Sequence, residues 1–243
     1  MAFLIYGATG AIGSSAARHL VAAGHKVHVS ARHADKLQAL ASELGCTSTA
    51  GDLSADGTIA SATQAALDDS GALDGLIYAV GSINLKPLSK LTQADFHRDF
   101  EVNALWAVQA VQAAVPALKL SPTTASIVLF STIAVGQGFT AHASVSMAKG
   151  AVEGLTRALA AELAPKVRVN CIAPSLVRSD LSAALVNNEA MAKAIAAMHP
   201  LPRLGEGEDI GPLAAFLAGP QSGWMTGQVL HVDGGRSSVR TKG

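Results

Sequence analysis

Three glycines spaced by three residues, Gly7, Gly10 and Gly13, lie between an apolar run and a stretch with helical spacing. Glycines at such a turn let the backbone bend tightly, approach a pyrophosphate and pack a helix closely against a strand. The amino end of that helix offers free N–H groups and a positive dipole end to the phosphates. An ordinary strand-to-helix turn is the alternative. The strand–loop–helix context favours binding of a dinucleotide.

The end of the second apolar run indicates which dinucleotide is bound. An acidic residue there would bind a ribose 2′-hydroxyl, whereas an arginine accommodates a 2′-phosphate. The chain has Ala31 and Arg32 at this point, which favours NADP(H) over NAD(H); a solvated surface arginine is the alternative. Asp52, after the third run, fits a carboxylate that accepts a hydrogen bond from the adenine amino group, or one that caps its own turn at Ser54.

Short apolar runs alternate with longer helical patterns along the whole chain. Strands are predicted at residues 2–6, 26–30, 46–50, 75–80, 126–130, 167–173 and 228–232. Helices are predicted at residues 11–24, 35–44, 58–67, 92–118, 146–163, 180–199 and 208–218. This alternation predicts an α/β fold: a Rossmann-type, doubly wound parallel sheet of about seven strands with helices on both faces. No linker-like stretch interrupts it, so residues 1–243 are interpreted as a single domain.

The bulk composition argues against several classes of partner. Eighteen basic residues balance 18 acidic ones, so the formal net charge is zero and no basic field favours nucleic acid or an anionic membrane. The first apolar run is too short for a signal peptide or a transmembrane helix. The two cysteines, Cys46 and Cys171, are interpreted as small buried hydrophobes in a reduced chain. We expect a cytoplasmic protein without a metal site.

With these features in view, the sequence resembles the short-chain dehydrogenase/reductase family along nearly its whole length. The resemblance is carried by the loop 7–13, Asp52-Leu53, Val102-Asn103, residues 146–155 around Lys149, residues 169–174 and residues 227–235. It implies hydride transfer between a nicotinamide dinucleotide and a small-molecule substrate. It also implies a homodimer or homotetramer built from the helices at 92–118 and 146–163. The implied cofactor contacts are Gly7, Thr9, Gly10, Ile12, Gly13, Arg32, Asp52, Leu53, Ala79, Gly81, Lys149, Pro174 and Val177.

The catalytic positions match that family only in part. Hydride transfer to a carbonyl builds negative charge on oxygen and needs a proton donor. In the family a tyrosine donates, a lysine four residues later lowers its pKa, a serine thirteen residues earlier positions the carbonyl, and an asparagine relays protons. Here Lys149 and Asn103 remain, and Thr132, with Ser131 beside it, occupies the serine register. The tyrosine position holds Val145, which can neither donate nor accept a proton.

Two further departures flank the same site. Residues 78–81 read Tyr-Ala-Val-Gly where the family has Asn-Asn-Ala-Gly, and Pro174 is followed by Ser175 where the family has glycine. The chain has only two tyrosines. Tyr6 is expected inside the first strand, and Tyr78 near the carboxyl end of the fourth strand, closer to the cofactor.

His142 is the candidate replacement for the missing donor. It lies seven residues before Lys149, and spacings of four and seven fall on one helix face. The family's divergent enoyl-acyl-carrier-protein reductases carry a tyrosine at this spacing and a pocket residue eleven positions earlier, where this chain has Ser131. A histidine there could act as an acid near neutral pH; a surface histidine at the helix start is the alternative. The glycine loop does not resemble that of the enoyl reductases.

Residues 180–202 are predicted to cover the substrate. Their apolar residues recur at helical spacing and either line an apolar pocket or pack in the core: Leu181, Leu185, Met191, Ile195, Met198 and Leu201. Trp224 and Met225 are expected near the same pocket or at an oligomer contact.

Two functions remain open from the sequence. One is an NADP(H)-dependent oxidoreductase acting on a carbonyl, an alcohol or an activated double bond of a small, apolar substrate. The other is a protein that holds NADP(H) without efficient turnover, as a sensor or assembly partner. Val145 favours the second function, whereas Lys149 and Asn103 favour the first.

Overall fold

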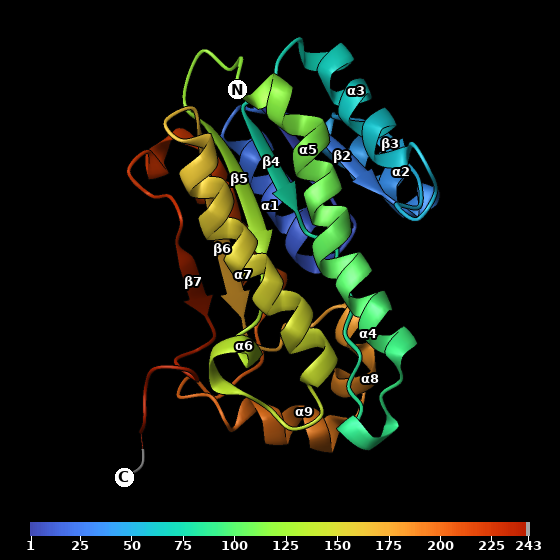
Figure 1. Ribbon diagram of the computed structural model, residues 1–243, viewed down its shortest axis with the longest axis vertical. Coiled ribbons are helices and arrows are strands. Elements are labelled where there is room, and N and C mark those ends of the chain that lie inside the picture. Colours follow the sequence, from blue (N-terminus) through green and yellow to red (C-terminus); the bar gives the residue numbers. More distant parts are fainter. Residues whose placement is uncertain (242–243) are drawn as a thin grey trace.

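A seven-stranded parallel sheet forms the centre of the computed structural model, which describes residues 1–241 (Figure 1). The strands are β1 (Ala2–Tyr6), β2 (Lys26–Ala31), β3 (Thr47–Ala50), β4 (Gly75–Tyr78), β5 (Ala125–Phe130), β6 (Val167–Pro174) and β7 (Val229–Val232). Their order is β3-β2-β1-β4-β5-β6-β7, and every neighbouring pair is parallel. The strand order reverses between β1 and β4, so the predicted doubly wound sheet is confirmed.

Helices cover both faces of the sheet. They are α1 (Ala11–Ala22), α2 (Ala34–Leu44), α3 (Thr58–Ser70), α4 (Gln93–Phe100), α5 (Trp106–Leu118), α6 (Ala134–Gln137), α7 (Ala143–Leu163), α8 (Ala183–Val186), α9 (Glu189–Ala196) and α10 (Gly207–Ala218). On β1, Leu4 and Tyr6 pack in the core under α3, α5 and α7, whereas Phe3 and Ile5 pack in the core under α1, α2 and α10. Because both faces are buried, the central strands are continuous apolar runs rather than alternating ones.

The predicted helix 92–118 is divided into three parts. Thr92 caps it as predicted, in a reciprocal capping box with Asp95. Between α4 and α5 the backbone makes a π-helical turn, Glu101–Leu105, which contains Asn103. The hydroxyl of Tyr78 donates a hydrogen bond of 2.9 Å to the carbonyl of Val102 in this turn. A π-helical turn shifts the local hydrogen-bond pattern, which hydrophobic spacing alone does not reveal.

The prediction of one helix over 180–199 was wrong. The segment forms a 3-10 turn at Asp180–Ser182 and two short helices, α8 and α9. The break falls at Asn187 and Asn188, because the Asn188 side chain accepts a hydrogen bond from the Met191 N–H and starts a new helix there. The segment lies beyond the carboxyl ends of the strands, at the bottom of Figure 1. We call residues 180–202 the cover.

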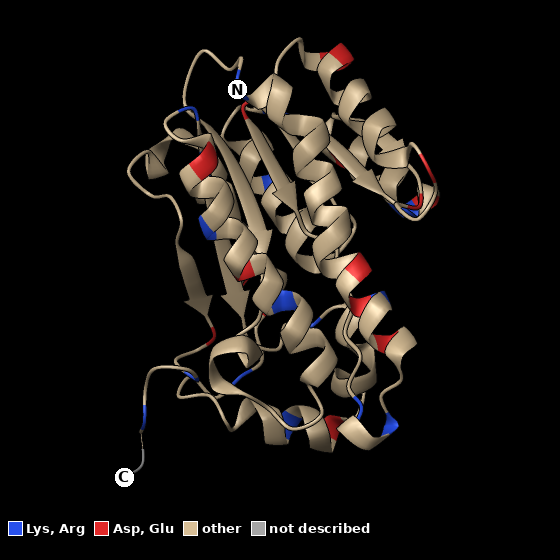
Figure 2. Ribbon diagram, in the orientation of Figure 1, with Lys and Arg blue, Asp and Glu red and all other residues tan. Residues whose placement is uncertain are grey.

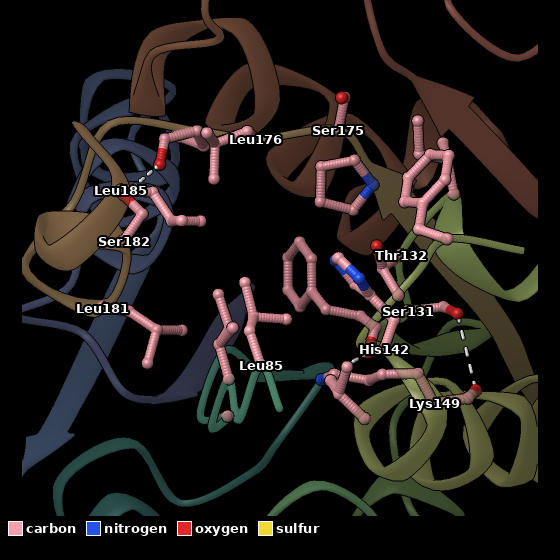
Figure 3. Close-up of a pocket in the computed structure, with 18 of the residues that line it drawn as sticks. Leu85, Ser131, Thr132, His142, Lys149, Ser175, Leu176, Leu181, Ser182 and Leu185 are labelled. Carbon is pink, nitrogen blue, oxygen red and sulfur yellow. Dashed lines mark hydrogen bonds between the residues drawn. The ribbon is translucent and has the colours of Figure 1, made fainter. Parts of the chain in front are cut away.

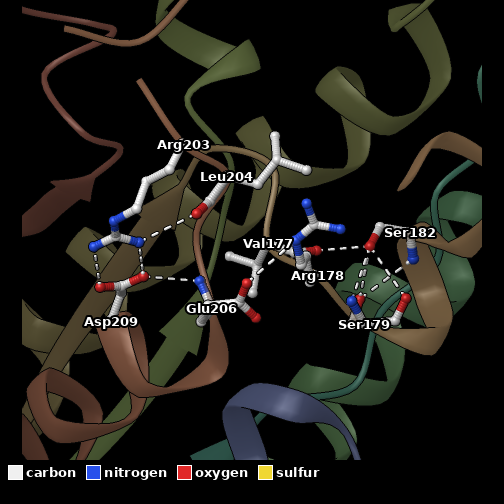
Figure 4. Close-up of polar contacts among 8 residues, drawn as sticks. All are labelled: Val177, Arg178, Ser179, Ser182, Arg203, Leu204, Glu206 and Asp209. Atoms are coloured by element: carbon white, nitrogen blue, oxygen red, sulfur yellow. Dashed lines mark hydrogen bonds and ion pairs between the residues drawn. The ribbon is translucent and has the colours of Figure 1, made fainter. Parts of the chain in front are cut away.

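Polar contacts hold both ends of the cover (Figure 4). Near the start of the cover, the Ser182 hydroxyl donates to the carbonyl of Val177, which precedes the cover, at 2.6 Å. After it, the Arg203 guanidinium binds both carboxylate oxygens of Asp209, at the start of α10. A parallel bridge between Val177 and Gly205 joins the two ends.

Charged side chains are sparse and mixed in sign. Figure 2 shows Lys and Arg interspersed with Asp and Glu on the face in view, without an extended region of one sign. Within residues 1–241, no helix combines the length and the apolar character needed to cross a membrane.

Candidate active site and nucleotide groove

The loop between β1 and α1 is built for close backbone packing. Gly7 has φ of +75°, and a Cβ there would lie 2.6 Å from the Ala79 carbonyl oxygen. A Cβ at Gly13 would collide with the Gly7 carbonyl and the Ala8 backbone. Gly10 precedes α1 without a side-chain cap, so the first N–H groups of this 12-residue helix have no side-chain acceptor there. The loop therefore presents backbone donors at the edge of a groove.

A groove of about 590 Å³ runs from this loop toward the ends of β2 and β3. The predicted cofactor residues that line it are Gly7, Thr9, Gly10, Ile12, Gly13, Arg32, Asp52, Leu53, Ala79, Gly81 and Val177. The remaining two, Lys149 and Pro174, line the adjoining cavity. Residues such as Ile12, Ala79 and Gly81 line both, so the groove and the cavity are continuous.

Two cationic side chains and a histidine gather at the far end of the groove. Arg32 is exposed beside His33, with 3.3 Å between Nη2 and the ring Nε2, and both line the groove together with Lys36. Lys36 also forms an ion pair of 2.7 Å with Asp180 of the cover. His33 and Lys36 were not predicted from the sequence as groove residues. Their positions shortly after Arg32, at the start of α2, could have indicated them. This cluster suits a phosphate on the ribose.

The Asp52 side chain makes the turn contact that was one of its two predicted roles. Its Oδ1 accepts hydrogen bonds from the Ser54 N–H at 2.9 Å and the Ser54 hydroxyl at 2.7 Å. These bonds hold the pKa of the Asp52 carboxyl below its usual range. The side chain also lines the groove, and its Oδ2 takes no part in these two bonds.

A second cavity, of about 550 Å³, opens where the groove meets the carboxyl ends of β4, β5 and β6. Lys149, Thr132 and His142 converge on it in Figure 3, opposite leucines of the cover. Lys149 is buried, and its ammonium donates to the Phe130 carbonyl at 2.9 Å. Burial lowers the pKa of Lys149 to about 8, partly opposed by Cys171 and Asp99.

A buried polar network supports this end of the cavity. The Asn103 amide donates to the Ser82 hydroxyl at 2.9 Å and to the Asp99 carbonyl at 2.8 Å. The Asp99 carboxylate accepts from Ser82 at 2.7 Å and from Ser144, on α7, at 2.6 Å. Asn103 thus holds the chain after β4 rather than facing open space. Asp99 was not predicted; its place one helical turn before Asn103 was the only sequence signal.

Of the two predicted hydroxyl residues, Thr132 is the better placed for substrate. Both line the cavity. The Ser131 hydroxyl donates to a carboxylate oxygen of Glu153 at 2.8 Å and is 3.4 Å from the Lys149 carbonyl, so it is directed toward α7 (Figure 3). Thr132 makes only a long contact of 3.3 Å, from the Ala134 N–H to its hydroxyl oxygen. Its hydroxyl proton is therefore available.

His142 occupies the N-cap position of α7 without a side-chain capping hydrogen bond. The helix begins at Ala143, three residues earlier than predicted, and His142 lines the cavity. Its Nδ1 lies 2.8 Å from the Thr140 carbonyl oxygen, which fixes the proton on Nδ1. Its Nε2 is therefore an acceptor in the neutral ring and a donor only in the imidazolium. Val145 is buried in the same wall and offers no polar atom.

Neither tyrosine can replace the missing donor. The hydroxyl of Tyr6 donates to the Ile59 carbonyl at 2.8 Å, and burial raises its pKa to about 12. The hydroxyl of Tyr78 is bound to Val102, and burial raises its pKa far above the usual value. Tyr78 lines neither the groove nor the cavity, so the prediction that its side chain lies closer to the cofactor was wrong.

The cover contributes part of the predicted apolar wall. Leu181, Leu185, Ile195 and Met198 line the cavity. Met191 and Leu201 are instead 42% and 61% exposed and do not line the cavity: Met191 lies on α9, which begins anew at Asn188, and Leu201 lies beyond the end of α9. Trp224 is fully exposed and does not line the cavity, and Met225 packs partly against the core under α1 and α10.

The fold and this cleft define a nucleotide-binding α/β protein with a reaction cavity at the carboxyl edge of its sheet. A family model described as enoyl-(acyl carrier protein) reductase matches residues 7–237. A tropinone reductase homolog of Arabidopsis thaliana is 32% identical over 96% of this chain and 90% of its own length. A hydroxynaphthalene reductase-like protein of Metarhizium acridum is 34% identical over 96% of this chain and 93% of its own.

A solved short-chain type dehydrogenase/reductase from Mycobacterium ulcerans superimposes with a TM-score of 0.91 at 30% identity, covering 98% of this chain and 90% of that one. The chain belongs to the short-chain dehydrogenase/reductase family of nicotinamide-dependent oxidoreductases.

The residues present fit a nicotinamide dinucleotide. A Cβ at Gly81 would stand 3.0 Å from Asn103 Oδ1 and 3.3 Å from Lys149 Nζ, so glycine leaves room beside both polar groups. The Ser30 hydroxyl, which lines the groove at the end of β2, is buried without a hydrogen-bond partner. A buried hydroxyl without a partner is costly unless a ligand completes it.

Proposed function

We propose that this protein is an NADP(H)-dependent oxidoreductase that acts on a carbonyl, an alcohol or an activated double bond of a small substrate with apolar parts. The observation that carries the proposal is one continuous cleft. It joins the amino end of α1, the cations around Arg32 and a cavity containing Lys149 and Thr132. NADPH, when bound, supplies the hydride.

The choice of NADP(H) rests on charge. Arg32, His33 and Lys36 line the end of the groove where β2 stops, and Ala31 offers no carboxylate for a free 2′-hydroxyl. The guanidinium suits a phosphate because its planar N–H groups match the phosphate oxygens. Lys36 is shared with Asp180, so a 2′-phosphate would compete with the cover for its ammonium.

The chain's own residues account for most of the reaction. The Thr132 hydroxyl orients the substrate oxygen, and the Lys149 ammonium stabilises negative charge developing on it. Asn103, Ser82 and Asp99 hold the segment after β4 against the cavity. His142, as imidazolium, gives up its Nε2 proton to that oxygen during reduction. The reverse reaction needs neutral His142, whose Nε2 accepts the proton.

A second candidate is a protein that binds NADP(H) without efficient turnover. Val145 supports it, because the cavity wall carries an apolar side chain where the family has its acid. General acid catalysis is typically worth ~10²–10⁴ in rate, so its loss with no substitute would leave little activity.

NADPH oxidation by the wild type and by Val145→Tyr, with matched ketones and enones, separates the two candidates. The tyrosine restores the i, i+4 pair with Lys149, whose ammonium favours the phenolate and makes the phenol a stronger acid. We expect wild-type turnover on at least one substrate class, and faster ketone reduction by Val145→Tyr.

Binding of NADPH must be measured on both proteins as the control. If the wild type binds NADPH but reduces nothing and Val145→Tyr gains activity, the non-catalytic function is supported. If neither protein binds NADPH, both candidates are rejected.

The assembly and location follow from the same proposal. We infer a homodimer or homotetramer in the cytoplasm that uses the outer surfaces of α4, α5 and α7. Leu105, in the π-helical turn between α4 and α5, is 45% exposed, and Met147 on α7 is 49% exposed, which supports a contact there. Size-exclusion chromatography with light scattering tests the assembly.

A further inference from the structure

One cation of the cavity has no part in the chemistry described so far. Arg236, after β7, lines the cavity together with Ser175, Met198 and Phe139. Its guanidinium lies 4.5 Å above the Phe139 ring, and its backbone carbonyl accepts a hydrogen bond of 3.1 Å from Gln137. Both its backbone and its side chain are therefore held at the cavity wall.

The Arg236 guanidinium has few acceptors. A guanidinium offers five N–H donors. Here Nη1 reaches the Ser175 hydroxyl oxygen at a long 3.5 Å, and Nη2 reaches the Met198 sulfur at 3.4 Å. Thioethers are weak acceptors, so most of the donor capacity remains available.

Ser175 is held in place by the cover. His199 Nδ1 lies 2.9 Å from the Ile195 carbonyl oxygen, so Nδ1 carries the proton and Nε2 is the acceptor in the neutral ring. The Ser175 hydroxyl donates to that Nε2 at 2.8 Å and turns its lone pairs toward other donors, of which Arg236 is one. Ser175 and His199 thus fix the side of the cavity on which the guanidinium lies.

Within residues 1–241, the positive charge of Arg236 is not balanced by an acidic side chain in the cavity lining. None of the described residues that line the cavity is Asp or Glu, whereas Lys149 and Arg236 both line it. The closest acid along the chain, Asp233, accepts hydrogen bonds from the Gly235 and Ser237 N–H groups at 2.9 and 2.8 Å. Burial lowers the pKa of Arg236, which Asp233 opposes, but a guanidinium stays charged in proteins.

The cation is connected to the reaction end of the cavity. Phe139, under the guanidinium, meets the His142 ring edge-on with 5.4 Å between ring centroids. A substrate held at Arg236 would therefore extend past Phe139 toward His142 and Thr132. Leu85, Leu181 and Leu185 supply apolar surface to the cavity, and uncharged hydroxyl side chains such as Ser179 line it as well.

We propose that Arg236 binds the carboxylate of the substrate, so that the substrate class is a carbonyl compound or alcohol with a short apolar chain ending in a carboxylate. The proposal rests on the proposed function for the reactive group, and on Arg236 alone for the acid. A single guanidinium suits a monoanion, and its planar fork matches carboxylate geometry.

Binding of unreactive probes to the NADP⁺-saturated protein tests the carboxylate independently of turnover. Hexanoate and hexanamide have the same chain and differ in the charge and donor pattern of the terminal group. By calorimetry, we expect the wild type to bind hexanoate more tightly, and Arg236→Gln to weaken hexanoate binding by about 10- to 100-fold while hexanamide changes little. Arg236→Lys should keep part of the preference. Arg178→Gln is the matched control, because Arg178 pairs with Glu206 and does not line the cavity.

Reduction of 5-oxohexanoate and its methyl ester by NADPH extends the test. The acid should have the higher kcat/KM, and Arg236→Gln should remove that preference mainly through KM. Equal binding of hexanoate and hexanamide by the wild type, or equal losses on Arg236→Gln, would overturn the proposal. Tighter binding of hexylphosphonate than of hexanoate would overturn the carboxylate assignment. If hexanoate binds as expected and no substrate is reduced, the failure lies with the proposed reaction and not with Arg236.

Discussion

The proton on one histidine nitrogen decides what His142 can do. Since its Nδ1–H is directed at the Thr140 carbonyl, only Nε2 can serve the cavity, and it donates only when the ring is charged. Burial lowers the pKa of Lys149, the cation at the same end of the cavity, to about 8. Reduction is therefore expected to depend on the charged form of Lys149.

His142→Phe should lower turnover by ~10²–10⁴ while leaving the affinity for NADPH intact. In both the wild type and His142→Phe, the rate of carbonyl reduction should fall above about pH 8, where Lys149 loses its charge. Steady-state rates across pH check this. Turnover unchanged in His142→Phe would assign the proton to Lys149 or a water molecule instead.

Arg32→Ala should weaken NADPH binding by about 10-fold or more and leave NADH binding unchanged, because only NADPH carries the 2′-phosphate. Fluorescence titration of both nucleotides measures the two affinities. Arg18→Ala is the matched control: Arg18 is a surface arginine paired with Glu43 at 2.6 Å and does not line the groove. Equal wild-type affinity for the two nucleotides would contradict the predicted preference.

At the scale of elements, the amino ends of two helices contribute to the site. The amino end of α1 supplies N–H groups to the groove, and the amino end of α7 brings His142 and Val145 to the cavity. The π-helical turn before α5 places Asn103 under the segment after β4. Each start depends on backbone packing rather than on a charged side chain.

Gly13→Val should abolish nucleotide binding, because its side chain would collide with the Gly7 carbonyl and displace α1 from the loop. Gly10→Ala is a milder test, since its Cβ would lie 3.3 Å from the Gly7 carbonyl oxygen. Gly154→Val on α7, where a Cβ meets nothing within 4 Å, is the control for adding a β-branched residue. NADPH titration with circular dichroism separates lost binding from lost folding. Full affinity in a folded Gly13→Val would place the nucleotide elsewhere.

At the scale of the whole molecule, the cleft lies between the carboxyl edge of the sheet and the cover. The Lys36–Asp180 ion pair connects the cover to α2, and the Val177–Gly205 bridge joins the segments that precede and follow the cover. A nucleotide filling this cleft contacts segments that are far apart in the chain. Binding is therefore expected to stabilise the domain as one unit.

NADPH at about 100 times its dissociation constant should add ~2.7 kcal/mol to the free energy of unfolding. For a domain of this size, that corresponds to a rise of roughly 5–10 °C in Tm. NADH at the same concentration should give a smaller rise. Differential scanning calorimetry measures both, and equal rises with the two nucleotides would argue against the role given to Arg32.

The sequence by itself determined the sheet, the glycine loop and the register of the catalytic positions. Strand burial leaves continuous apolar runs, and glycine spacing is set by local backbone geometry, so both are readable along the chain. The absence of a tyrosine four residues before Lys149 was visible for the same reason. These features leave their record in short stretches of the sequence.

Only the tertiary structure decided which side chains meet across the cleft. The Ser131 hydroxyl binds Glu153 although Ser131 lines the cavity, and the Tyr78 hydroxyl binds the Val102 carbonyl away from it. Arg236 reaches Phe139 from almost a hundred residues away in the sequence. Such contacts depend on how β5, β7 and the cover are placed by the whole sheet, and neither periodicity nor motif spacing records that placement.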